Sequence, residues 1–194
     1  GGKLVRGEVG IQEGGAGAFV RLLHQGRLVQ QGEVAILGPF RLRAVVDFTG
    51  GFDDLQWQRL PDPLLWSLVA EPIVLAVENA ITRALRLEPE NRAILSHASD
   101  WLVRWARDSK PTFAKLPRPL KEAKLFGLIG ATRVSLAELG AMTTWRYVQG
   151  KSSFVEPMLS GEPVLALGLR KKAVLEHLDR SRLVNAEGQL REEF

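Results

Sequence analysis

The order of apolar and polar positions divides the chain into a strand-rich beginning, a helical middle and a second strand-rich part. In "GPFRLRAVVDF", every second residue from Phe40 to Val46 is apolar, and Arg41, Arg43 and Val45 lie between them. This alternation predicts a half-buried strand, because successive side chains of a strand point to opposite faces. Upstream, short apolar runs are expected to turn at Gln25-Gly26 and Gln31-Gly32, where glycine tolerates positive φ. We therefore expect an antiparallel meander.

Helical periodicity replaces this alternation between Asp62 and Leu87. Apolar residues recur there at steps of three and four, which predicts an amphipathic helix. The residues on this face are Trp66, Val69, Ile73, Val77, Ala80, Ile81 and Ala84. Pro72 cannot donate a backbone hydrogen bond, so either the helix kinks there or a short helix ends and a longer one begins. A second helix is expected from about Glu90 to Arg107, where Trp101 and Trp105 stack within the core at an i,i+4 step.

The part of the chain after Leu120 returns to short segments typical of strands. These segments are "AKLFGLIG", "TWRYV", "EPVLALG", "AVLEHL", "RLVNAE" and "QLREEF", and glycines separate them. The proline-rich residues 110–119 predict a domain boundary. The layout indicates an α+β fold, with an α+β amino-terminal domain over residues 1–110 and a small β-rich domain over residues 120–194.

Composition narrows the classes of protein that fit this layout. The 194 residues are 45% hydrophobic, which is enough for a packed core. The absence of cysteine excludes disulfides and thiolate chemistry, and it fits a reducing, cytoplasmic location. The longest apolar stretch, Pro63–Val77, is interrupted by Glu71 and Pro72 and is shorter than the roughly 20 residues of a membrane span. We expect a cytoplasmic protein without a membrane span.

Charge argues against nucleic acid as a partner. The net charge is +4, from 26 basic and 22 acidic side chains whose signs are interspersed over most of the chain. A surface that binds phosphates usually has a concentrated basic patch. The densest basic stretch, Arg104–Lys124, contains three prolines and is expected to be a solvated connector.

The histidines and paired carboxylates do not predict a reaction centre. His24, His97 and His177 lie far apart, and none has a second ligand at a helical step, so no metal site is expected. Asp53 and Asp54 follow two glycines and are more simply explained as a turn or a helix cap. An enzyme built on Asp53, Asp54 or His24 would need these side chains to converge in one pocket.

The glycine-rich and serine-containing stretches do not predict a catalytic or cofactor site either. "QEGGAGAFV" comes before a strand, whereas a loop that binds phosphate follows a strand and opens a helix. "GKSS", at 150–153, lacks the upstream glycine of a P-loop, and Ser152 and Ser153 have neither a nucleophile elbow nor a nearby base. We therefore expect no enzyme, no cofactor and no metal, and binding or scaffolding as the role.

Residues 130–148 allow two interpretations, the start of a helix-turn-helix or a short helix in a β-rich module. Ser135 and Glu138 have the spacing of a capping box, which predicts a helix beginning at Leu136. Gly140 is expected to end it at the C′ position. The following "AMTTWRYV" is rich in β-branched and aromatic residues and predicts a strand, whereas a second helix would be needed to read DNA.

The segment "LIGATRVSLAELGAM" resembles the opening of a SpoA domain (surface presentation of antigens). Such domains occur in flagellar switch proteins and in the SctQ component of the cytoplasmic ring of type III secretion systems. The matching positions are Leu128, Gly130, Thr132, Val134, Ser135, Leu136, Glu138 and Leu139. "GEPVLALG" and "RLVNAEGQL" resemble the closing strands of the family. "LPDPLLWSLVAEPIVLAVENAITRAL" is similar in pattern to the helical part of the SctQ amino-terminal region.

The resemblance implies a non-enzymatic scaffold of a secretion or flagellar cytoplasmic ring (sorting platform), peripheral to a membrane-embedded machine. SpoA domains pair with one another, as homo- or heterodimers, and receive an amphipathic segment of a stator or ATPase-linker protein. Apolar residues of the predicted strands are then the candidates for binding the partner: Leu165, Leu167, Val174 and Leu178. The alternative is a bacterial transcription regulator with a winged helix-turn-helix.

Overall fold

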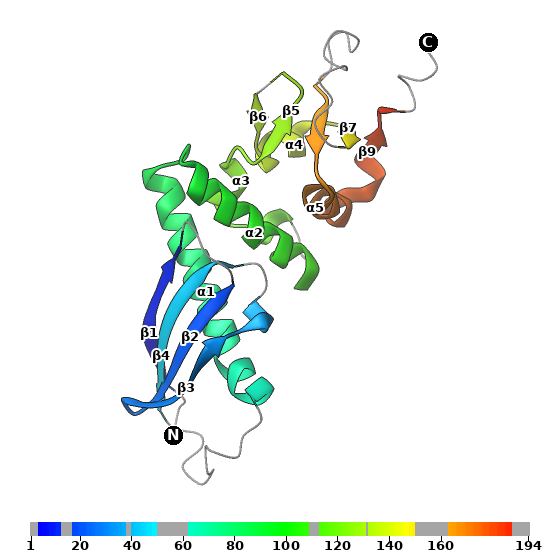
Figure 1. Cartoon of the computed structure of the whole chain (residues 1–194). Coiled ribbons are helices and arrows are strands. Elements are labelled where there is room, and N and C mark those ends of the chain that lie inside the picture. Colours follow the sequence, from blue (N-terminus) through cyan, green and yellow to red (C-terminus); the bar gives the residue numbers. More distant parts are fainter. Residues whose placement is uncertain are drawn as a thin grey trace. The chain divides into compact units, whose positions relative to one another are not determined.

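The computed structural model describes residues 4–12, 17–37, 40–49, 62–108, 113–130, 132–149 and 163–187. The fold class is α+β, as the sequence predicts, and the chain divides into two compact units, residues 1–81 and 82–194 (Figure 1). The sequence instead placed the boundary in the proline-rich residues 110–119. The second long helix, Arg92–Asp108, thus belongs to the second unit.

The first unit contains a four-stranded mixed sheet of order β1-β4-β2-β3. Its elements are β1 (Leu4–Ile11), β2 (Ala18–His24), β3 (Arg27–Glu33), the 3-10 helix η1 (Ala35–Leu37) and β4 (Leu42–Thr49). β2 and β3 form the predicted hairpin, in which Gln25 and Gly26 have φ values of 51° and 79°. Gly32, however, lies within β3, so the turn predicted there is wrong.

β4 runs parallel to β2 and antiparallel to β1, so the predicted meander is also wrong. Turn residues specify which neighbouring segments form a hairpin, but they do not specify which strand becomes central. β4 has the most buried side chains of these strands, and it lies between β1 and β2. In this position both of its edges form backbone hydrogen bonds.

Helix α1 (Asp62–Leu87) packs on the apolar face of this sheet. Leu42 and Val46 of β4 are buried, and Val46 lines one small hollow together with Ile73 of α1. Five of the seven apolar helix positions predicted at steps of three and four are buried: Trp66, Val69, Ile73, Val77 and Ile81. The other two, Ala80 and Ala84, are half-buried. Pro72 lies inside one continuous helix, so α1 does not divide into a short and a longer helix.

Two contacts tie β4 to its neighbours. The buried carboxylate of Asp47 accepts hydrogen bonds from Arg6 Nη2 at 2.9 Å and from the backbone N–H of Gly26 at 3.2 Å. The Arg6 guanidinium holds the pKa of Asp47 below its usual range. At Gly7, a Cβ atom would lie 2.1 Å from the carbonyl oxygen of Val45, so β1 and β4 approach more closely there than any side chain allows.

The second unit contains a five-stranded sheet of order β6-β5-β8-β7-β9 (Figure 1). β5 is antiparallel to β6 and β8, whereas β7 is parallel to β8 and β9. The elements of the second unit are α2 (Arg92–Asp108), η3 (Phe113–Lys115), α3 (Arg118–Glu122), β5 (Phe126–Leu128), β6 (Arg133–Val134), α4 (Leu136–Ala141), β7 (Trp145–Gln149), β8 (Leu165–Leu167), α5 (Leu169–Asp179), η4 (Arg180–Arg182) and β9 (Leu183–Asn185).

Helix α2 confirms the helix predicted over Glu90–Arg107, and Trp101 and Trp105 stack with ring centroids 6.2 Å apart. α2 packs against α5, where Arg170 lies 3.8 Å from Asp100. Within the described part of the chain, none of the helices has the length and apolar character that a membrane crossing requires.

Four of the predicted strands after Leu120 are present as β5, β7, β8 and β9. β7 occupies the place where a helix-turn-helix would need its second helix, so the strand prediction is confirmed there. "AVLEHL" is not a strand but part of α5, because two parallel strands on either side of β7 need a crossover, and a helix supplies it. "QLREEF" begins at Gln189 and lies outside the described residues.

Candidate functional site

Residues at the start of helix α4 cap its amino-terminal end. The hydroxyl of Ser135 accepts a hydrogen bond from the backbone N–H of Glu138 at 3.2 Å, and the backbone N–H of Ser135 donates to the Glu138 carboxylate at 2.7 Å. This is the predicted capping box, and the helix begins at Leu136 as expected. Gly140, however, lies inside the last turn, and Met142 forms the C-cap with an extended backbone, so the predicted C′ glycine is wrong.

A basic side chain from another segment strengthens this cap. Lys124 forms an ion pair with the second carboxylate oxygen of Glu138. Together with the hydrogen bond from the backbone N–H of Ser135, it lowers the pKa of Glu138 from 4.5 to about 2. The carboxylate is therefore charged at neutral pH, and it joins α4 to the chain segment that precedes β5.

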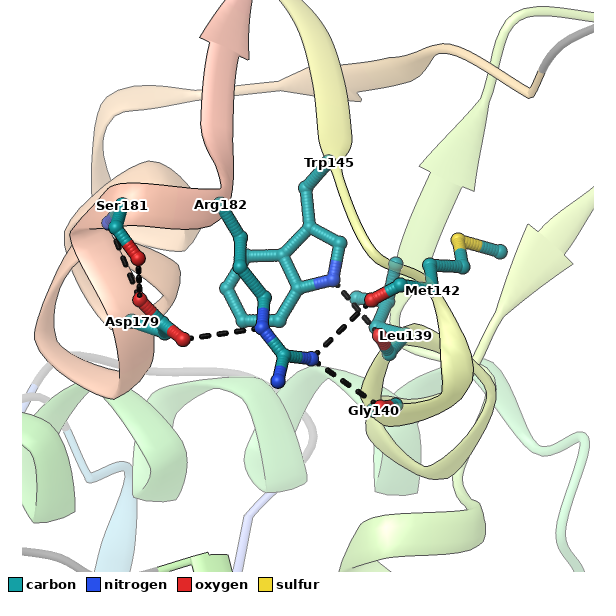
Figure 2. A network of polar contacts seen from close by, with 7 residues as sticks. All are labelled: Leu139, Gly140, Met142, Trp145, Asp179, Ser181 and Arg182. Atoms are coloured by element: carbon teal, nitrogen blue, oxygen red, sulfur yellow. Dashed lines mark hydrogen bonds and ion pairs between the residues drawn. The ribbon is translucent and has the colours of Figure 1, made fainter.

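Two side chains that follow α4 in sequence bind its carboxyl-terminal end (Figure 2). The indole N–H of Trp145 donates to the carbonyl of Leu139 at 2.7 Å, and both groups are buried. Arg182 donates to the carbonyls of Gly140 at 3.2 Å and Met142 at 3.1 Å. The last carbonyls of a helix have no partner within it, and a cation is favoured beside them, so these three hydrogen bonds stabilise this end.

Asp179 holds the Arg182 guanidinium in this position (Figure 2). Its carboxylate lies 3.0 Å from Arg182 Nε and accepts hydrogen bonds from the backbone N–H of Ser181 at 3.1 Å and from its hydroxyl at 2.6 Å. These hydrogen bonds, with the nearby guanidinium, lower the pKa of Asp179. The result is a fixed polar network between the end of α5, η4 and the end of α4.

A pocket of about 320 Å³ lies beside this network. Its lining includes Leu136 and Trp145, which are both buried, together with Leu178 and the partly exposed Phe113. The remaining lining comes from Ala137 and Gly140 of α4 and from the Asp179–Arg182 pair. The pocket is thus mainly apolar, with one ion pair at its rim.

The wall formed by Phe113 is fixed from two sides. A Cβ atom added at Gly140 would lie 3.4 Å from the ring carbon Cζ of Phe113, so the ring packs directly on the α4 backbone. The Lys121 ammonium lies 5.3 Å from the centroid of the same ring and also donates to the carbonyl of Ala114 at 3.2 Å. The cation–π contact places a positive charge next to the pocket.

The polar groups at the pocket form hydrogen bonds or ion pairs with other parts of the same protein. The Trp145 N–H is bonded to Leu139, and Arg182 is bonded to two carbonyls and to Asp179. A carboxylate with a lowered pKa is a poor general base near neutral pH. Across the residues that the structure describes, no group of three or more potential metal ligands comes together.

The residues predicted to bind a partner have different positions. Leu165, Leu167 and Val174 are buried in the core of the second unit, the first two on β8 and the third on α5. Leu178 is half-buried, lies on α5 rather than on a strand, and lines the pocket. The structure therefore brings one of these four side chains to the candidate site.

Among the candidate catalytic and metal-binding residues, the structure describes the three histidines. His24 lies on β2, His97 on α2 and His177 on α5. Asp53, Asp54, Ser152 and Ser153 lie outside the described residues. The pocket residues that sequence analysis missed are Phe113, Trp145 and Arg182, because the contacts among them join segments distant in the chain.

Comparison with known proteins shows a likeness of fold. No family model matches the chain, and no curated protein matches it. A solved structure, the middle domain of a protein designated a heat shock protein in Plasmodium falciparum, is similar with a TM-score of 0.50 and 13% sequence identity. The match covers 89% of this chain and 73% of that one.

Proposed function

We propose that the chain is a non-enzymatic scaffold that docks a segment of another polypeptide in the pocket beside α4. The observation that carries this proposal is an apolar pocket whose polar rim groups are already bonded within the protein. Such a pocket recognises an apolar side chain by shape and by removal of its surface from water.

The size of the pocket supports a side chain as its occupant. Its volume of about 320 Å³ is at the lower end of the roughly 300 to 1,000 Å³ of ligand pockets. One or two apolar side chains suit this volume better than a large cofactor does. Trp145 in the pocket lining is held by its hydrogen bond to Leu139, so its side chain loses little conformational entropy on binding.

The sheet edges of the unit that contains the pocket are weaker candidates for docking. In the second unit the edge strand β6 has two residues and the opposite edge strand β9 has three. Strand addition draws its affinity from a row of backbone hydrogen bonds, and short edges offer few of them. We therefore assign the main contact to the pocket.

A selection of peptides displayed on phage against the full chain tests this proposal. Ala137→Leu places a larger side chain at the pocket wall, whereas Ala141→Leu adds the same side chain at an exposed position of α4 outside the pocket lining. Enriched peptides should bind the Ala141→Leu variant like the original protein and the Ala137→Leu variant at least about tenfold more weakly. Equal binding to both variants would refute the pocket as the docking site.

The finer form of this proposal is a component of a type III secretion or flagellar cytoplasmic ring. It is supported by the resemblance of "LIGATRVSLAELGAM" to SpoA domains. The partner would then be the stator or ATPase-linker protein of the same system. Size-exclusion chromatography with light scattering should give a complex of defined mass. If the chain stays monomeric with this partner, the finer form is wrong and the pocket proposal stands.

The fold likeness favours a second candidate. The similar solved structure is the middle domain of a heat shock protein, and the match covers 89% of this chain. The chain would then be a middle domain of that kind of protein. Suppression of the aggregation of a heated test enzyme would support this candidate, and suppression lost in Ala137→Leu but kept in Ala141→Leu would place the activity at the pocket.

A further inference from the structure

We infer that the segment docked in the pocket beside α4 has an apolar side chain flanked by carboxylates. This inference rests on the proposed function and specifies the chemistry of its partner. It follows from the distribution of charge between the two units and from the groups around Phe113 and Arg182.

The positive charge of the chain is concentrated in the second unit. Residues 82–194 have 19 basic and 13 acidic side chains, a net charge of +6. Residues 1–81 have 7 basic and 9 acidic side chains, a net charge of −2. The unit that contains the pocket therefore attracts an acidic partner, and the attraction increases the rate of encounter.

The charged groups near the pocket are consistent with this excess of positive charge in the second unit. The carboxylate in the lining, Asp179, is paired with Arg182 at 3.0 Å and is also bonded to Ser181. Its negative charge is therefore compensated. Lys121, in contrast, interacts with the Phe113 ring and the Ala114 carbonyl, and neither of these groups carries a charge. Lys121, which is not among the lining residues, thus supplies positive charge next to the Phe113 ring that lines the pocket.

The apolar ring of Phe113 and the ammonium of Lys121 lie close together. Phe113 forms one wall of the pocket, and the Lys121 ammonium lies 5.3 Å from the centroid of its ring. An apolar side chain packed on this wall therefore brings its neighbouring residues close to a cation. Carboxylates at these neighbouring positions gain an ion pair, whereas lysines there are repelled.

Titration of the isotopically labelled full chain with short peptides tests the inference. The peptides share one central phenylalanine, and its neighbours are glutamates, glutamines or lysines; a fourth peptide has glutamates around a central alanine. The buried Trp145 indole N–H provides an NMR signal from the pocket lining. The glutamate peptide with phenylalanine should bind about tenfold more tightly than the glutamine peptide, and high salt should reduce this difference.

Two variants locate the charge. Lys121→Glu should reverse the preference and favour the lysine peptide, and Lys121→Gln should reduce the glutamate preference without reversing it. Arg146→Glu, on β7 and outside the pocket lining, is the matched control and should leave the order of the peptides unchanged.

The outcomes separate this inference from the proposed function. Equal affinity for the acidic, neutral and basic peptides would overturn the acidic preference and leave apolar docking in place. Equal binding of the alanine and phenylalanine glutamate peptides, or binding of a short DNA duplex that competes with them, would make the surface a general polyanion site and overturn the inference. If no peptide shifts the Trp145 signal, the proposed pocket itself is refuted.

Discussion

The guanidinium of Arg182 lies over the indole ring of Trp145, 5.7 Å from its centroid, and both side chains hydrogen-bond to the carboxyl-terminal end of α4 (Figure 2). The short helix is thus held at the side of the sheet by two residues of β7 and η4. This arrangement also forms one side of the pocket.

Replacing Arg182 should loosen the end of α4. Arg182→Ala removes two hydrogen bonds to carbonyls, the pair with Asp179 and the contact with Trp145. The free energy of unfolding should fall by about 1 to 2 kcal/mol, because each bond contributes modestly once exchange with water is considered. Arg182→Lys should recover less than half of this loss, since a single ammonium cannot reproduce the fork of the guanidinium.

Urea unfolding measures these changes, and the neighbouring exposed Arg180 provides the control. Arg180→Ala should change the free energy of unfolding by less than about 0.5 kcal/mol. If the Arg180 and Arg182 variants lose the same stability, Arg182 has no special role in holding α4.

The cap of α4 should respond differently to changes at Ser135 and Glu138. Ser135→Ala removes the acceptor for the backbone N–H of Glu138 and should lower the free energy of unfolding by about 1 kcal/mol. Glu138→Gln keeps a capping side chain, because glutamine also accepts from the N-cap backbone, and loses only the charge that pairs with Lys124. Its loss at neutral pH should be smaller.

The pH dependence of the Glu138 contribution has a defined sign. The pKa of Glu138 is lowered from 4.5 to about 2, so its stabilising effect is complete above pH 4.5 and disappears as the pH falls towards 2. The original protein should therefore lose stability in this interval more steeply than Glu138→Gln. Unfolding curves recorded over this pH range measure the difference in stability. Parallel pH profiles for the two proteins would show that native contacts do not lower the pKa of Glu138.

Gly7 should be far less tolerant of alanine than Gly10 on the same strand. A Cβ atom at Gly7 would lie 2.1 Å from the Val45 carbonyl oxygen, whereas one at Gly10 would lie 3.9 Å from the Arg43 carbonyl oxygen. Gly7→Ala must push β1 away from β4 and should cost about 2 kcal/mol or more. Gly10→Ala should be neutral or slightly stabilising. Thermal unfolding of the two variants gives the comparison, and similar melting temperatures would refute the close approach.

Asp47 and Arg6 should behave as a coupled pair in the first unit. Asp47→Ala leaves the backbone N–H of Gly26 without its carboxylate partner as well as removing the ion pair, and it should cost about 2 kcal/mol. Arg6→Ala removes an exposed partner and should cost about 1 kcal/mol. The double variant should lose little more than Asp47→Ala alone, as measured by a double-mutant cycle. Additive losses would mean that the two side chains act independently.

Local signals in the sequence predicted the parts of the structure that depend on local contacts. The steps of three and four in α1, the alternation in β4 and the Ser135–Glu138 cap are each set within a few residues. The meander predicted for the first sheet was wrong, because the order of strands depends on which strand buries most surface in the finished sheet. α5 was missed because a short apolar run fits either a strand or a buried helix turn.

The candidate site shows the same limit. Leu178 was proposed as a contact residue, and it does line the pocket, although from a helix. The Arg182 side chain that anchors α4 meets Met142 across 40 residues of sequence, and no spacing rule connects the two. In a single sequence Arg182 looks like any arginine before a strand, because its contacts form only after the chain has folded.

The place of β7 in its sheet has a consequence for synthesis on the ribosome. Both strands that pair with β7, β8 and β9, follow it in the chain, and β9 ends at Asn185. The strand must therefore leave the exit tunnel well before either neighbour is available, with Trp145 and Tyr147 still uncovered. During that interval these apolar side chains have no neighbouring strand, and a chain truncated before Leu183 would leave the β9 side of β7 unpaired.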